Sequence, residues 1–328
     1  MSSSPTDCVP RGRFERRCAD TPSGERCALR DCLLYAYERP VYQTAPIVSW
    51  LLEHQAKIQS YAWIGAMILV ALWESFRPRR ALAAGTGIRW LNNIGLKAAE
   101  GLLVWLLLPL ALFSFAMLVE ERGWGLLNAI SAPLWLSCIL TVLLLDLSAY
   151  AVHRIFHAVP LLWRCHKVHH CDIEVDCGTA IRHHPLESLL VIGADFLIVA
   201  VLGAPPLGVL IATMLAALAA VFNHGNVAMP AAVDRVLRPW LVTPDMHRVH
   251  HSTSFQESNS NFSNLFSCWD RFFATYRAQP ELAPEAMQLG LEEARTAGEL
   301  TFWKLLVMPF VAARQTAPKE TAQPQSAS

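Results

Sequence analysis

The sequence predicts an all-α protein: a polytopic membrane bundle of about four to five spanning helices, including a short hairpin, with a histidine-rich cap on the cytoplasmic side. Three observations predict it. Hydrophobic residues make up 53% of the chain and charged residues only 16%, whereas a soluble protein usually carries about 25% charged residues. Five long apolar stretches lie between two polar ends. All of the 12 histidines except His54 lie between His153 and His251.

The two ends of the chain lack apolar periodicity. Residues 1–45 mix Arg, Asp, Glu, Ser and Pro, a composition that buries too little apolar surface to fold alone. We therefore expect a weakly ordered N-terminal extension over residues 1–45, a membrane-embedded domain over 46–314 and a disordered tail over 315–328. The formal net charge is zero, which argues against a nucleic-acid partner.

The five apolar stretches are the candidate membrane helices. A spanning helix needs roughly 20 apolar residues, with about 17 as the lower limit. The first three stretches reach this length, and the last two are short and separated only by the sequence APP. We expect these two to form a hairpin that crosses the bilayer and returns. In chain order, the stretches cover residues 58–76, 96–118, 133–151, 186–203 and 207–222.

Arginines orient the predicted bundle. The segment after the first stretch carries four arginines between positions 77 and 89, whereas the loop EERGWG after the second carries one. Basic loops stay on the cytoplasmic side, so residues 77–95 are expected inside and residues 119–132 outside. Following the remaining spans from there places every clustered histidine on the cytoplasmic side. The later segment GELTFWKLLVMPFVAARQ is short and interrupted, and we expect an interfacial helix there.

Helical spacing organises the histidines. Positions i, i+3 and i+4 share one face of a helix, so HxxxH aims two imidazoles at one point and HxxHH aims three. Neutral imidazole suits iron, zinc, copper or nickel, and one ion takes about four to six ligands. Nine convergent histidines therefore predict two metal ions. They are His153, His157, His166, His169, His170, His224, His247, His250 and His251.

Other residues are candidates for supporting roles. His184, before Pro185, is either a further ligand or a helix cap. Metal-bound histidines need hydrogen-bond acceptors that fix their tautomer. Asp146 and Tyr150 share the helix face of the first histidine pair, and we expect them around the metal site. Glu187 and Asp245 are expected there because they lie close to ligands in the sequence.

At these residues the chain resembles the fatty acid hydroxylase/sterol desaturase superfamily of membrane di-iron enzymes. The resemblance rests on DLSAYAVHRIFH, WRCHKVHH, RHHPLE, FNHGN, TPDMHRVHHS and WDRFFATY, in this order, over about residues 130–277. It implies further residues around the metal site at Asn226, Asn261 and Asp270. Ser263 and Ala274 stand where the family commonly has glycine, and both are small.

The resemblance also implies a reaction. It implies an oxidoreductase with two non-haem iron ions and O2 as co-substrate, acting on a lipid (fatty acyl, sterol or related) taken from the membrane lipids around it. Electrons would come from a separate donor, such as ferredoxin, cytochrome b5 or a reductase, because the sequence shows no HPGG stretch, Rossmann fingerprint or CxxC. Hydroxylation is expected before desaturation, although the ligands alone do not separate the two.

Two other kinds of metal protein remain open. A transporter binds its ions near the bilayer midplane, often between internal repeats, whereas these histidines lie outside the apolar stretches. A zinc-dependent hydrolase needs about three ligands, far fewer than nine. The iron content of the purified protein would separate these alternatives from an oxygenase.

Overall fold

The computed structural model describes residues 46–82, 86–108 and 110–311, and in these residues helices and isolated bridges are the regular structure, with no strand. The predicted extension over 1–45 and tail over 315–328 lie outside the described residues. The first half contains α3 (Pro46–Glu53), α4 (Gln55–Phe76), α5 (Thr86–Leu107), α6 (Leu112–Glu121), α7 (Leu126–Ala129), α8 (Leu134–Ala158) and α9 (Pro160–His170). The second half contains η1 (Cys177–Ile181), α10 (Pro185–Leu202), α11 (Pro206–His224), α12 (Ala231–Leu237), α13 (Pro244–His250), α14 (Phe255–Ser258), α15 (Cys268–Phe272), η2 (Ala297–Glu299), α16 (Phe302–Val307) and η3 (Met308–Phe310).

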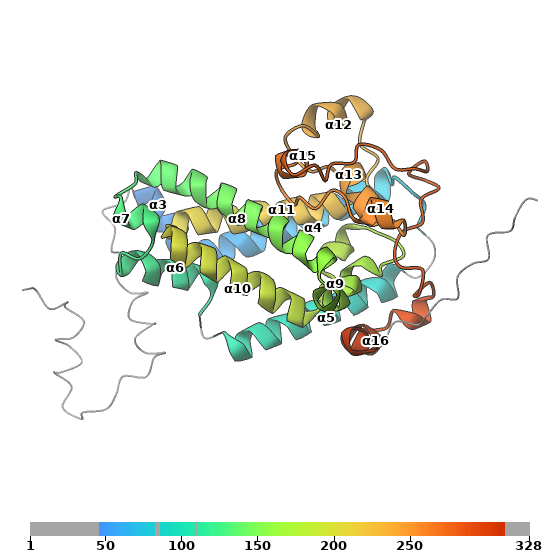
Figure 1. The fold of residues 1–328 in the computed structure, drawn as a ribbon, viewed down its shortest axis with the longest axis horizontal. Coiled ribbons are helices and arrows are strands. Elements are labelled where there is room, and N and C mark those ends of the chain that lie inside the picture. Colours follow the sequence, from blue (N-terminus) through green and yellow to red (C-terminus); the bar gives the residue numbers. More distant parts are fainter. Residues whose placement is uncertain (1–45, 83–85, 109, 312–328) are drawn as a thin grey trace, which may run out of the picture. The chain divides into compact units, whose positions relative to one another are not determined.

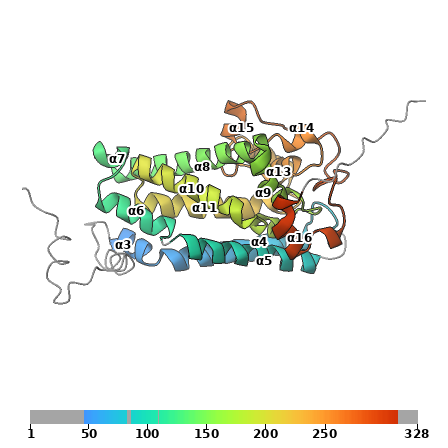
Figure 2. The same cartoon turned by 60° about the horizontal axis from the view of Figure 1, so that its bottom comes forward.

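The hairpin of α10 and α11 forms the middle of the bundle. Helix α8 packs against one side of the hairpin, and α4 and α5 pack against the other (Figures 1 and 2). The hairpin predicted from the APP sequence is therefore confirmed, with α10 ending at Leu202 and α11 beginning at Pro206. Proline suits the first position of α11, because a backbone N–H at a helix start has no partner within the helix and proline lacks that N–H.

The long helices have the composition of membrane spans. Five segments are long and apolar enough to cross a bilayer: α4, residues 86–129, α8, α10 and α11. Their outward faces carry large apolar side chains such as Tyr61, Leu69 and Trp105, which are 73%, 69% and 72% exposed. Soluble proteins rarely expose apolar surface this extensive. The protein is therefore an integral membrane protein.

The second span differs from the sequence expectation of one helix over 96–118. Helix α5 begins at Thr86, and the chain breaks between Leu107 and Leu112 before α6. Pro109 falls in this break, and proline inside a helix removes a backbone hydrogen bond and clashes with the preceding turn. The early start has another cause: the first turns of α5 include the buried polar residues Arg89 and Asn93, which hydrogen-bond the segment after α9, so hydropathy does not reveal them.

The turn between α10 and α11 is held by two glycines. Gly203 ends α10 with φ +74°, and Gly125, before α7, has φ +90°. A Cβ on Gly125 would lie 2.1 Å from the Gly203 nitrogen, and one on Gly203 would lie 2.6 Å from the Trp124 oxygen. Only glycines allow these two backbones to approach so closely.

Helices α9, η1 and α13 gather at the opposite end of the bundle, where α8 and α11 end (Figures 1 and 2). The arginine-rich segment after α4 is held at this same end, because Arg79 N donates to Asn226 O at 2.8 Å and Pro78 forms a bridge with Val227. All nine candidate ligand histidines and the first basic loop therefore share one end of the bundle, as predicted. That this end faces the cytoplasm stays a prediction.

Buried ion pairs attach η1 to α5. Arg89 donates to Asp172 at 2.8 and 3.0 Å and to Asp176 at 3.0 Å. Arg182, which is fully buried, donates to Asn93 Oδ1 at 2.9 Å and to Val168 O at 3.0 Å. Breaking a buried pair by removing one partner costs about 3–5 kcal/mol, so this network fixes the loop that follows α9.

Candidate metal centre

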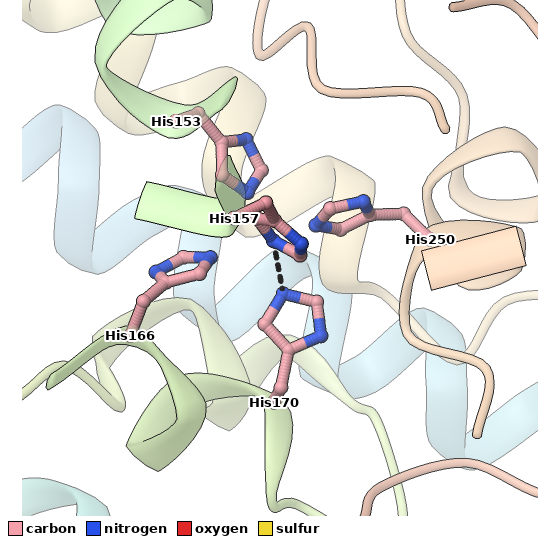
Figure 3. A group of neighbouring side chains, drawn as sticks. All are labelled: His153, His157, His166, His170 and His250. Carbon is pink, nitrogen blue, oxygen red and sulfur yellow. Dashed lines mark hydrogen bonds between the residues drawn. The ribbon is translucent and has the colours of Figure 1, made fainter. Parts of the chain in front are cut away.

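Nine histidines converge into two groups. Within each group, the candidate ligand nitrogens all lie within 4.8 Å of one another. Group A is His153, His157, His166, His170 and His250 (Figure 3), and group B is His169, His224, His247 and His251. These are the nine predicted ligands, so the structure brings the whole predicted set together. Their binding of metal stays a prediction.

The two HxxHH segments each serve both groups, which differs from the expectation that each aims three imidazoles at one point. In α9, His166 and His170 enter group A and His169 enters group B. In α13 the roles are reversed, because His250 enters group A while the i, i+4 pair enters group B. At about 100° per residue, i and i+4 are about 40° apart, whereas i+3 lies about 60° to the other side of i. This divergence lets one turn of helix supply two sites.

Backbone carbonyls orient four of the group A and group B rings, those of His153, His169, His224 and His250. His153 Nδ1 faces Phe262 O at 2.7 Å, His250 Nδ1 faces Ser260 O at 2.8 Å, and His169 Nδ1 faces Arg182 O at 3.1 Å. A carbonyl only accepts hydrogen bonds, so the proton of each neutral ring must lie on Nδ1. The bare Nε2 lone pair then points into the group.

Unpartnered nitrogens mark the interior of group A. The Nε2 atoms of His153, His166 and His250 are buried and have no hydrogen-bond partner in the structure. Figure 3 shows the five rings pointing toward a common centre from three segments of the chain. Buried polar atoms are nearly always satisfied, so three orphaned lone pairs facing one point indicate a cation site.

Group B gives a second indication of a cation. His224 Nδ1 donates to Ala220 O at 2.7 Å and His169 Nδ1 donates to Arg182 O, so neither ring has a proton left for Nε2. Yet the two Nε2 atoms lie 3.1 Å apart, and His247 Nε2 is also 3.1 Å from His224 Nε2. Two bare lone pairs repel at this distance. Nitrogens that bind one ion at about 2.1 Å lie about 3 Å apart, so a shared ion resolves the conflict.

Burial keeps the imidazoles neutral. Desolvation lowers the pKa of His169, His170, His247 and His251 well below the ordinary value, and neighbouring imidazoles lower it further. The pKa of His250 falls to about 3 for the same reasons. Metals bind the neutral imidazole, so the protein holds its candidate ligands in the competent protonation state.

Glu187 is the predicted carboxylate that contacts a ligand. It accepts from His166 Nδ1 at 2.7 Å and from His183 Nδ1 at 3.0 Å. The His183 ring is stacked on His169 at 4.4 Å. One carboxylate thus orients a group A histidine directly and a group B histidine through the stacked ring.

Asp146 and Tyr150 form their hydrogen bonds with residues other than histidine among the described residues, and their predicted part in the metal site stays a prediction. Asp146 accepts from the backbone N–H of Leu265 and Phe266 at 3.1 and 3.0 Å and from Trp269 Nε1 at 2.8 Å. The Tyr150 hydroxyl lies 2.9 Å from Thr275 Oγ1. Both side chains attach the C-terminal segment to α8.

Asn226 and Asp245 also contact residues other than the histidines. Asn226 exchanges hydrogen bonds with the backbone of Arg80, at 2.9 and 3.1 Å. Asp245 pairs with Arg248 at 2.8 Å and with Arg79 at 3.1 Å. They fix the basic loop after α4 against α11 and α13, and so hold the histidine-bearing helix ends together.

Asn261 and Asp270 support the carbonyls that orient the ligands. Asp270 accepts from the N–H groups of Phe262 and Ser263 at 2.8 and 3.0 Å. Asn261, with φ +55°, donates to Met246 O at 3.0 Å. Residues 260–263 are therefore locked in the shape that presents Ser260 O and Phe262 O to the rings. Ala274, at a commonly glycine position, also has a positive φ of 57°, which is consistent with the turn that glycine would favour.

His184 lies outside both groups. Its Nδ1 accepts from Leu186 N at 3.2 Å, which caps α10, and its Nε2 faces Leu306 O at 3.1 Å. Both ring nitrogens are therefore engaged, and of the two predicted roles the structure shows the cap. His54 lies at the start of α4, where its Nδ1 faces Trp50 O at 3.0 Å.

Sequence reasoning missed the backbone acceptors and the aromatic residues around the groups. The Phe262 ring lies 5.1–5.5 Å from the rings of three group A histidines, and Trp163 lies 4.9 Å from His157 and 5.3 Å from His170. Carbonyls are common to every residue, so no sequence signal identifies the ones that contact a ligand. An aromatic residue at helical spacing from a ligand is the signal that could have found Trp163.

Comparison with known proteins places these residues within a matched region. Residues 138–275 match the fatty acid hydroxylase family. The chain is 27% identical over 179 residues to an ornithine lipid hydroxylase of Rhizobium tropici, covering 54% of this chain and 51% of that protein. It is 28% identical over 154 residues to the alkylglycerol monooxygenase of Homo sapiens, covering 45% and 31%. It is 29% identical over 163 residues to the cholesterol 25-hydroxylase of Rattus norvegicus, covering 49% and 53%.

These matches leave much of each relative uncovered. The chain spans about half the length of the ornithine lipid and cholesterol enzymes, and less than a third of the alkylglycerol enzyme. No solved structure matches the chain.

Proposed function

We propose that this chain, a member of the fatty acid hydroxylase/sterol desaturase superfamily by the match of residues 138–275, is a membrane di-iron oxygenase. Its reaction would be the hydroxylation of a C–H bond of a lipid. The observation that carries the proposal is the division of nine buried or half-buried histidines into two groups, in which acceptors on Nδ1 leave the Nε2 atoms of five rings without a proton. Groups A and B would each hold one iron. Bound iron would supply the activation of O2, chemistry that amino-acid side chains do not perform.

The protein's own residues would prepare the site. Backbone carbonyls and Glu187 hold protons on Nδ1, which keeps the Nε2 lone pairs available. The rings of Trp163 and Phe262 pack against group A and would help to keep water out of it. A dry site protects a reactive centre from side reactions, which an oxygenase acting on an unactivated carbon requires.

The relatives favour hydroxylation over desaturation. The three compared proteins are named as hydroxylases or monooxygenases of an ornithine lipid, alkylglycerol and cholesterol. Their lipids differ widely in head group, so the names support a lipid substrate without selecting one. Desaturation of the same lipid remains the second outcome, because the ligand set is common to both reactions.

The remaining parts of the proposal concern the surroundings of the site. The cytoplasmic face is supported by the basic segment after α4, which lies at the histidine end of the bundle. Electrons would come from a separate protein on that face, either ferredoxin, cytochrome b5 or a reductase. Zinc hydrolysis and metal transport are less well supported, since the two groups have nine imidazoles and lie where the helices end.

Metal analysis of the purified full chain tests the proposal. We expect about two irons per chain and a hydroxylated lipid in membranes that contain the protein, O2 and an electron donor. One zinc per chain, together with hydrolysis of a lipid ester and no consumption of O2, would instead support the hydrolase alternative.

Substitution of one ligand tests the site assignment. We predict that His169→Ala removes activity and lowers the iron content while the protein still inserts into the membrane, because the apolar spans are unchanged. His54→Ala is the matched control, since His54 lies at the start of α4, outside both groups. Lipid analysis and iron measurement on both variants decide the assignment. Full activity in His169→Ala would contradict it.

A further inference from the structure

A groove runs along the outer side of α8, beside the metal centre. It has a volume of about 290 Å³. Leu147, Ala151, Ile155 and Ala158 form its floor, and Phe273 forms one wall. The four floor residues recur at helical spacing on one face of α8, one of the membrane-spanning helices. The groove is therefore mainly apolar, and it lies near the end of α8 that carries the histidines.

Arg154 is the charged residue of this groove. Its side chain is exposed, and no ion pair or hydrogen bond of Arg154 occurs in the part of the chain that the structure describes. Arg154 lies four residues before the end of α8 at Ala158, at the depth where a long basic side chain reaches the head-group layer. An apolar floor ending at an unpaired cation complements an acyl chain that ends in an anionic head group.

The groove adjoins group A through aromatic rings. Tyr150 lines the groove and is stacked on Phe273 at 5.2 Å. The Tyr150 ring meets Phe262 edge-on at 6.3 Å, and Phe262 contacts His153 at 5.5 Å. Two aromatic layers therefore separate the groove from the candidate metal site. A lipid held in the groove would lie next to the place of reaction.

We propose that this groove binds a membrane lipid with an anionic head group, with the acyl chain along α8 and the phosphate or carboxylate on Arg154. The inference rests on the proposed function, in that it names the class of lipid the oxygenase selects. The groove would hold such a lipid beside group A, on the other side of the Tyr150 and Phe262 rings.

Photo-crosslinking in lipid nanodiscs tests the groove without turnover. The full chain is placed in phosphatidylcholine discs that contain a little phosphatidylglycerol with a photoreactive acyl chain, or phosphatidylcholine with the same chain. Labelled peptides are then located by mass spectrometry. We expect the phosphatidylglycerol probe to label peptides around 147–158 and 272–273 about fivefold more than the phosphatidylcholine probe, the advantage that one surface cation provides.

Two variants separate the cation from the groove. Arg154→Gln should remove the fivefold preference, whereas Arg235→Gln, at an exposed arginine of α12, should leave it unchanged. Ala151→Trp should fill the floor and remove labelling by both probes from the groove peptides. Leu197→Trp, at a residue that is 62% exposed on α10, is the matched control and should leave the labelling unchanged.

The outcomes are distinct from those for the oxygenase. Equal labelling by both probes in the unmodified chain, or a preference that survives Arg154→Gln, overturns the proposed head-group selection. Labelling of the groove peptides that survives Ala151→Trp overturns the site itself. Because crosslinking needs neither iron nor O2, a chain that selects the anionic probe but forms no product refutes the proposed function alone.

Discussion

At the scale of single residues, the fold fixes which nitrogen carries the proton in five of the nine candidate ligand imidazoles. His153, His169, His224 and His250 all place Nδ1 against a backbone carbonyl, at 2.7–3.1 Å. His166 instead uses a carboxylate, that of Glu187. The same arrangement leaves Nε2 free on every one of these rings, so the tautomers are set by the fold before any ion binds.

Glu187 gives a residue-scale prediction. Glu187→Gln removes the charge that orients His166 and His183, and loss of such a partner typically costs about 10–100-fold in metal affinity. We predict at least about a tenfold weaker retention of iron by the variant during dialysis against a chelator. Glu100→Gln is the matched control, because Glu100 is also a buried carboxylate but accepts from Lys97. Equal retention of iron by both variants would show that Glu187 has no part in holding the metal.

The candidate ligands could be predicted from the sequence, whereas their division into groups A and B could not. HxxxH and HxxHH spacing identifies His153, His169 and six other candidate ligands because ligands on one helix must repeat at helical intervals. His224 lies outside these patterns and was predicted from its place in the histidine cluster and from FNHGN. The partition depends on where α9 and α13 point relative to each other, which is a tertiary property. The contacts of Asp146 could not be predicted for a related reason: it shares the helix face of the candidate ligands, but its carboxylate accepts hydrogen bonds from the distant segment 265–269.

At the scale of elements, the α10–α11 hairpin carries His224 back to the other ligands. Its turn could be predicted from the sequence APP between two apolar stretches, because proline ends one helix and begins the next. Its partner could not be predicted, because the contact with residues 124–125 joins segments far apart in the chain. The break near Pro109 was missed because hydropathy continues across it and hides the interruption.

The turn gives an element-scale prediction. Gly125→Val places a side chain against the backbone of Gly203 at a φ of +90°, and strained backbone of this kind costs about 1–3 kcal/mol before any clash is counted. We predict a clearly lower unfolding temperature for this variant in detergent. Gly193→Ala is the control, since a Cβ there meets nothing within 4 Å, and its unfolding temperature should be unchanged or higher. An unaltered temperature for Gly125→Val would mean that the two turns are not in contact.

At the scale of the whole molecule, both candidate sites, the basic loop after α4 and the C-terminal ends of α4, α8 and α11 lie at one end of the bundle (Figure 2). The opposite end carries α7 and the glycine turn. Because of this separation, all nine histidines lie on the same side of the membrane, whichever way the bundle is oriented.

Cysteine labelling answers that question. In a chain without its native cysteines, Arg235→Cys marks α12 at the histidine end and Arg122→Cys marks the end of α6. Both positions are exposed. We predict that an impermeant thiol reagent added outside intact cells labels the Arg122→Cys protein, and labels the Arg235→Cys protein only after permeabilisation. The reverse pattern would place the site on the outer face.

Protonation of the buried imidazoles gives a prediction for the whole fold. Burial lowers the pKa of His169, His170, His247, His250 and His251 in the folded protein, with His250 at about 3. Below about pH 6.5 the unfolded chain binds protons at these residues and the folded chain does not. The free energy of unfolding therefore falls as pH falls, by up to about 1.4 kcal/mol per pH unit for each histidine, until the folded pKa is reached.

The measurement is made on iron-free protein in detergent. We expect a lower unfolding temperature at about pH 5 than at about pH 7.5, and a smaller difference in the iron-loaded protein because metal binding favours the folded state. An unfolding temperature of the iron-free protein that rises on acidification would contradict the neutral, buried state of the rings.

The crossed use of α9 and α13 limits how such a centre can be altered. Each of these two helices contributes ligands to both groups, so removing or shifting either one damages both sites together. No deletion of one histidine segment of this pair yields a protein with one intact site, and a one-metal derivative can be reached only by replacing individual residues. Exchange of α9 or α13 between proteins would therefore change both groups at once.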